Sequence, residues 1–71
     1  MDLTELSDME RTLESYIDKI SVPNLLEAVS RICIEKAQHI RENWQDESMA
    51  MAWEKNGYKI MKCITKLDMR I

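Results

Sequence analysis

Residues 50–71 read AMAWEKNGYKIMKCITKLDMRI, and apolar or small residues recur in this stretch at alternating spacings of three and four. The positions that follow this rhythm are Ala50, Trp53, Gly57, Ile60, Ile64, Leu67 and Ile71. A seven-residue repeat of this kind lays one apolar seam along a helix and is typical of a helix packed lengthwise against another. The sequence therefore predicts a helix over about 47–70 whose seam faces a second helix.

Residues 23–44 are the natural partner for that seam. Pro23 fits the first turn of a helix, with Ser21 as a candidate cap. The main apolar stripe of this helix is Leu26, Val29, Cys33, Ala37, Ile40 and Trp44, and a second strip beside it is Leu25, Ala28 and Ile32. Two apolar strips imply two neighbours, so we expect this helix to be the central one.

A turn near residue 45 is required if the two helices are to meet. No Gly or Pro separates them, so one continuous helix over residues 23–71 is the alternative. Trp44 and Trp53 are nine residues apart, which places them on opposite faces of a straight helix. A turn at residues 45–48, capped by Asp46 or Ser48, would let both apolar faces pack together. We therefore favour a helical hairpin.

The hairpin has a definite register if it turns near residue 45. Antiparallel pairing then places Trp53 near Ala37 and Gly57 near Cys33. Glycine lowers helix propensity by up to about 1 kcal/mol, so its presence within a helix calls for a compensating reason. We expect close approach of the two helices at Gly57.

Residues 3–20 form a third amphipathic segment at the N-terminus. Its apolar side is Leu3, Leu6, Met9, Leu13, Tyr16, Ile17 and Ile20. A capping box at residues 7–10 offers a later start for the regular helix. With Asp2, which precedes it, the segment is acidic, with six carboxylates in residues 2–20 against Arg11 and Lys19. We expect it to pack across or alongside the hairpin.

Length and composition predict a single all-α domain covering residues 1–71. One Gly, one Pro, no Phe and 32% charged residues fit a helical protein. Ordering a chain this short costs roughly 1.5 kcal/mol per residue, which a small core barely offsets. Self-association into a homodimeric helical bundle is therefore expected to supply part of the stability.

The cysteines, the N-terminus and the charge all bear on location. Cys33 and Cys63 sit in apolar helical segments, so we interpret both as buried thiols in a reducing compartment. The acidic N-terminus does not resemble a signal peptide, and no apolar run approaches the ~20 residues that span a bilayer. With a net charge of −3, we expect a cytoplasmic protein without membrane association.

No catalytic, cofactor-binding or metal-binding residues are predicted, and we expect the protein not to be an enzyme. His39 shares a helix side with Glu35 and Glu42, but its spacing from Glu35 is one residue longer than in the carboxylate-bridged di-iron bundles. Cys33 and Cys63 lack a Cys-x-x-Cys spacing. A metal or redox site at Cys33, Cys63 and His39 is kept as an alternative.

Two surface features of residues 47–70 could bind a partner. A basic stripe lies opposite the seam, formed by Lys55, Lys59, Lys62, Lys66 and Arg70. Met51, Tyr58 and Met69 align on the side away from the seam, where Met and Tyr suit protein interfaces. Together with Trp44 and Trp53, the stripe, Met51 and Tyr58 form the candidate partner surface.

The favoured function is that of a small interaction or regulatory protein that binds another protein through helix faces. A nucleic-acid-binding module that uses the Lys55–Arg70 stripe is the alternative, although the low helix charge and the lack of interleaved aromatics argue against it. The run from Glu35 to Asp46, followed by Trp53-Glu54-Lys55, resembles short uncharacterised helical proteins of cyanobacteria. That resemblance covers under a third of the chain and implies no activity.

Overall fold

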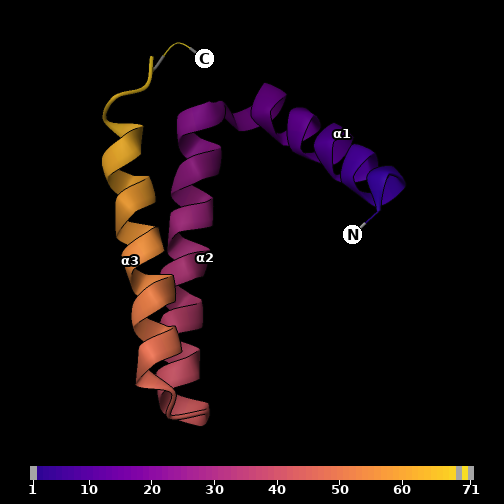
Figure 1. The fold of residues 1–71 in the computed structure, drawn as a ribbon. Coiled ribbons are helices and arrows are strands. Elements are labelled where there is room, and N and C mark those ends of the chain that lie inside the picture. Colours follow the sequence, from indigo (N-terminus) through magenta and orange to yellow (C-terminus); the bar gives the residue numbers. More distant parts are fainter. Residues whose placement is uncertain (1, 69, 71) are drawn as a thin grey trace.

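The computed structural model describes residues 2–68 and 70. It contains three helices, α1 (Leu3–Ile20), α2 (Val22–Asn43) and α3 (Glu47–Ile64). Figure 1 shows α2 and α3 side by side and antiparallel. It also shows that α1 joins the start of α2, at the end of the hairpin away from the α2–α3 turn. The all-α class and the hairpin are confirmed, and the observed bounds of α1 and α2 lie within one residue of those predicted.

The α2–α3 interface is built from small residues rather than large ones. Ala50 and Gly57 of α3 are buried against Ser30, Cys33 and Ala37 of α2. The other described seam positions of α3 flank this line as half-buried side chains: Trp53, Ile60 and Ile64. The seam predicted from the seven-residue repeat is therefore the packing face of α3, and small residues let the two backbones come close.

The two helices approach each other closely at Gly57. A Cβ atom at Gly57 would lie 2.9 Å from Ile34 Cγ1, 3.1 Å from the Ser30 carbonyl oxygen and 3.3 Å from Cys33 Cβ. The predicted pairing of Gly57 with Cys33 is confirmed, and so is the reason for a glycine within the helix. Even a single Cβ atom here would require the Ile34 side chain to shift and the Ser30 carbonyl to give way slightly.

Ser30 was not expected in the interface, because hydrophobic spacing assigned Val29 to the main stripe instead. Ser30 is fully buried, and its hydroxyl donates a hydrogen bond of 2.9 Å to the Gly57 carbonyl oxygen. A buried hydroxyl is tolerated only when it has such a partner. Val29 lies at the half-buried edge of the interface.

The turn between α2 and α3 occupies residues 44–46. Gln45 adopts a positive φ of 52°, and the Asp46 carboxylate accepts a hydrogen bond of 3.0 Å from the Met49 amide. Of the two caps considered, Asp46 is the one that caps α3. The hydrogen bond satisfies an amide that lacks a partner within the helix.

The third helix ends earlier than predicted, at Ile64 rather than near residue 70. Lys66 and Leu67 donate their amides to the carbonyls three residues back, at Cys63 and Ile64. The Thr65 hydroxyl also donates to the Lys62 carbonyl oxygen, at 2.8 Å. These short-range bonds compete with helical ones and close the last turn. The predicted seam residue Ile71 lies outside the described residues.

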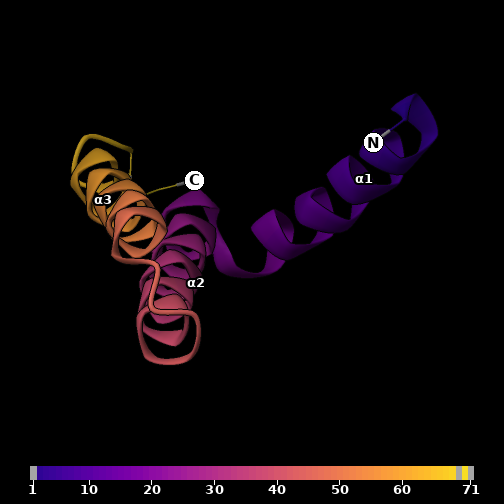
Figure 2. The ribbon, with the colours of Figure 1, turned by 60° about the horizontal axis from the view of Figure 1, so that its bottom comes forward.

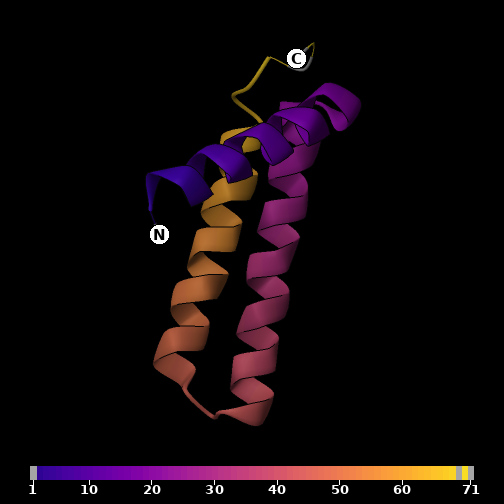
Figure 3. The same ribbon diagram turned by 90° about the vertical axis from the view of Figure 1, so that its right-hand side faces the viewer.

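The first helix begins at Leu3, so the capping box at residues 7–10 does not start it. The Asp2 carboxylate caps it by accepting a hydrogen bond of 2.8 Å from the Glu5 amide. The expectation that this helix packs across or alongside the hairpin is wrong. In Figures 1 and 2, α1 meets the hairpin only near the start of α2, and its N-terminal end projects away from the hairpin; in the view of Figure 3, α1 passes in front of the hairpin and runs crosswise to it.

The linker explains this geometry. Only Ser21 separates α1 from α2, with φ 77° and ψ 162°, and its amide donates to the Ile17 carbonyl oxygen. Helices that fold back on one another need loops of two to five residues. Pro23, in the first turn of α2, further restricts the chain here. The junction therefore holds α1 away from the hairpin.

Replacing Gly57 by leucine tests the close approach. We expect Gly57→Leu to lower the free energy of unfolding by about 1–3 kcal/mol, because the side chain must enter space held by Ile34 and the Ser30 carbonyl. Urea unfolding followed by circular dichroism measures the change. Ala52→Leu, at an exposed position of the same helix, is the control. Equal midpoints for the two variants would contradict the close approach.

Candidate interaction surface

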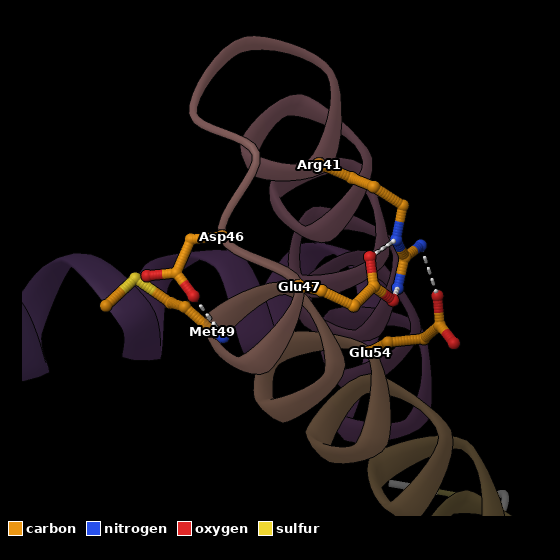
Figure 4. Close-up of polar contacts among 5 residues, drawn as sticks. All are labelled: Arg41, Asp46, Glu47, Met49 and Glu54. Atoms are coloured by element: carbon orange, nitrogen blue, oxygen red, sulfur yellow. Dashed lines mark hydrogen bonds and ion pairs between the residues drawn. The ribbon is translucent and has the colours of Figure 1, made fainter.

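A charged cluster holds the turn end of the hairpin together. The Arg41 guanidinium donates two hydrogen bonds, of 2.8 and 2.9 Å, to the Glu47 carboxylate and a third, of 3.0 Å, to Glu54. Figure 4 shows Arg41 reaching from α2 across to these two side chains of α3, beside the Asp46–Met49 cap. The hydrogen bonds from Arg41 hold the pKa of Glu47 below its ordinary value, while hydrogen bonds to Glu47 and Glu54 raise the pKa of Arg41. We interpret this cluster as structural, because an arginine guanidinium stays protonated near neutral pH and so does not act in proton transfer.

The largest uncovered apolar surface is on α1. We define the α1 stripe as the six apolar side chains on one side of this helix that are 40–81% exposed: Leu3, Leu6, Met9, Leu13, Tyr16 and Ile20. Within α1 only Ile17 is half-buried. These residues were predicted to face the hairpin, so their value as a free surface was missed. The signal that could have revealed it is the single residue between the two helices.

A second uncovered face lies on the hairpin. Lys36 Nζ sits 5.5 Å from the centre of the Trp53 ring, so these two residues lie on the same side of the hairpin. Helical spacing from them places further apolar residues on that side. We define the hairpin face as Leu25, Val29, Ile32, Trp53 and Ile60, of which Ile32 is 50% exposed and the others are half-buried.

The hairpin face contains part of the second strip predicted on α2. That strip was expected to have a neighbour, yet within the described chain Ile32 and Ala28 are exposed. The two-neighbour pattern in the sequence is therefore matched by only one neighbour along most of α2. Within the described chain, the second apolar strip of α2 therefore lacks the neighbouring helix that its pattern predicts.

The predicted partner surface is spread over separate parts of the hairpin. Trp44 is 73% exposed at the turn end, whereas Trp53 is half-buried beside Lys36. Met51, Tyr58 and Met61 are exposed. Helical spacing places them, with Glu54, on the side of the hairpin opposite Trp53. Met69, predicted to align with Met51 and Tyr58, lies outside the described residues.

The basic stripe is exposed along its described length. Lys55, Lys59 and Lys62 lie on α3, whereas Lys66 and Arg70 follow the end of the helix. Arg70 is also engaged by Asp68, whose carboxylate accepts from the guanidinium at 2.7 Å. Four lysines in residues 55–66, with no acidic residue among them, form a local cationic patch.

The residues considered for metal or redox chemistry occupy different environments. Cys33 is buried beside Gly57, but Cys63 is exposed, so the interpretation of both thiols as buried is wrong for Cys63. Cys63 lies in the last turn of α3 and is open to solvent. His39 is exposed, with Nδ1 3.1 Å from the Asn43 amide nitrogen. In the part of the chain that the structure describes, no group of three or more metal-ligating side chains comes together.

Two shallow hollows lie along α1. One is lined by Arg11, Thr12, Ser15, Tyr16 and Lys19, and another by Asp8, Met9, Thr12 and Leu13. Both are open depressions between neighbouring side chains of a single helix, unlike the enclosed clefts that bind small molecules. Within residues 2–68, no helix has the length and apolar character to cross a membrane.

Comparison with known proteins adds no relative. No protein-family model matches the chain, and no curated protein or solved structure matches it either. The case for a function therefore rests on the surfaces described above.

The Arg41–Glu47 pair predicts a pH dependence of stability. Above the ordinary carboxyl pKa of 4.5, Glu47 is charged in both the folded and the unfolded chain, so the pair contributes fully. As the pH falls below that value towards the lowered pKa, the unfolded chain takes up the proton first and the contribution is lost. We expect Glu47→Gln to unfold with a shallower acid dependence than the unmodified chain, measured by thermal melts between neutral and acidic pH. Glu35→Gln, at an exposed site on α2 outside the cluster, is the control; an acid dependence unchanged in Glu47→Gln would argue against the pair.

Proposed function

We propose that this chain is a small non-enzymatic interaction or regulatory module that binds another protein by docking the α1 stripe. The observation that carries the proposal is the exposure of six apolar side chains, all on one side of a helix that projects from the hairpin. Contiguous exposed apolar surface of this kind is typical of an interaction site.

The stripe has the spacing of a helix that binds in a hydrophobic groove. Its residues recur every three or four positions, from Leu3 to Ile20. Fully burying one large apolar side chain is worth about 1.5–3 kcal/mol, so a partner covering several of them would gain substantial affinity. The carboxylates that flank the stripe would set the orientation of a complementary partner.

Docking would also stabilise α1 itself. Helices shorter than about 12–15 residues are marginal in isolation, and an 18-residue helix with one apolar side still draws most of its stability from packing. In the described chain α1 has little such packing. A partner helix or groove would supply it.

Site-specific photo-crosslinking tests this function. A photoreactive amino acid in place of Leu13, in the centre of the stripe, should yield a crosslinked protein product from cells. The same amino acid in place of Ser15 should not, because Ser15 projects from the other side of α1. Products are separated by gel electrophoresis and identified by mass spectrometry. Absence of any product at position 13, or equal products at both positions, would count against docking through the stripe.

A further inference from the structure

One chain carries two uncovered apolar faces, the α1 stripe and the hairpin face. We propose that each is the partner of the other in trans: the α1 stripe of one copy packs on the hairpin face of a second copy, and the second copy returns its own α1. The result is a two-fold symmetric dimer with reciprocally exchanged first helices. This inference rests on the proposed function, since it identifies the protein that docks on α1.

The junction argues against the same contact within one chain. The single residue between Ile20 and Val22 is too short for α1 to turn back along α2. The Asn24 amide reinforces the junction by donating to the Ile20 carbonyl oxygen at 2.7 Å and to Ser21 Oγ at 3.3 Å. The first helix therefore cannot reach the hairpin face of its own chain, but it can reach the hairpin face of a second copy.

The exposed area is large enough to form a dimer interface. The chain exposes 5936 Å², whereas a folded monomer of 8.4 kDa is expected to expose about 4,600 Å². The excess, about 1,300 Å², is greater than the roughly 800 Å² that each partner buries in a standard stable interface. The radius of gyration, 14.3 Å, likewise exceeds the roughly 11 Å expected for a compact chain of this length.

Charge favours a second copy over an unrelated partner. Residues 2–20 carry six carboxylates against two cations, for a net charge of −4, and residues 55–66 carry four lysines and no acid, for a net charge of +4. On α1, Glu10 and Glu14 each follow a residue of the stripe. On α3, Lys59 is adjacent to Ile60 of the hairpin face. Docking α1 on a second hairpin would therefore bring segments of opposite net charge close to one another.

Reciprocal exchange also satisfies both faces at once. A two-fold axis makes each copy donate one α1 and accept another, so the assembly closes as a dimer and leaves neither face open. Each hairpin then receives a third helix against Leu25, Val29 and Ile32. That helix is the second neighbour that the two apolar strips of α2 require.

The test uses charge substitutions at two positions of similar exposure, Leu13 at 42% and Ile32 at 50%. The unmodified chain should sediment as a dimer. Leu13→Glu and Ile32→Glu should each weaken dimerisation on the order of a hundredfold, because each places a charge in both copies of the interface. Ser15→Glu, and Tyr58→Glu at 52% exposure on the opposite side of the hairpin, should leave the dimer intact.

Mixing the two weakened variants is diagnostic of exchange. A heterodimer of Leu13→Glu with Ile32→Glu has one doubly substituted contact and one fully native contact. The mixture should therefore regain dimers that neither variant forms alone. Circular dichroism of each variant, at the temperature and concentration of the sedimentation run, must show that the helices are still formed, which separates loss of association from loss of folding.

Several outcomes would overturn the exchange. These are a monomeric unmodified chain, a dimer that persists in Ile32→Glu, or a mixture that does not re-associate. A monomer that still crosslinks from position 13 to a different protein would overturn the exchange while leaving the proposed function in place. A monomeric chain that gives no crosslinked product from position 13 would contradict both the exchange and the proposed function.

Discussion

The structure depends on how closely α2 and α3 approach at Gly57. There the backbone of α3 lies so close to Ser30, Cys33 and Ile34 that a Cβ atom would meet all three within 3.3 Å. The Ser30 hydroxyl bonds the Gly57 carbonyl oxygen across this contact, so a polar group can be buried without penalty. Because the fully buried residues of the interface are small, close approach of the two helices contributes to its stability.

The first helix is attached to the hairpin but is not covered by it. Arg41 ties the two helices at the turn end through Glu47 and Glu54, and Asp46 caps the start of α3. At the other end, Ser21 leaves α1 projecting with its apolar side open to solvent. The small core and the exposed apolar side of α1 are the two observations behind the proposed partner.

Much of the hairpin could be predicted from the sequence, and the reasons are physical. The phase change between Trp44 and Trp53 required a turn, and Asp46 was one of two residues able to cap the following helix. The seven-residue repeat identified the packing face of α3 and the role of Gly57. Ser30 was missed because a search for hydrophobic spacing passes over a hydroxyl whose partner is a carbonyl 27 residues away. The early end of α3 was missed because Thr65 and the three-residue backbone bonds compete with a periodicity that continues beyond it.

The sequence by itself determined three amphipathic helices, their boundaries near Pro23 and Asp46, and the register of the hairpin. These follow from local spacing and capping, which act between residues close along the chain or through a repeated pattern. Only the tertiary structure decided which apolar faces are covered. Periodicity shows that a helix side seeks burial, but whether a neighbour can reach it depends on the linker. With a single residue at Ser21, the apolar side of α1 stays uncovered within its own chain.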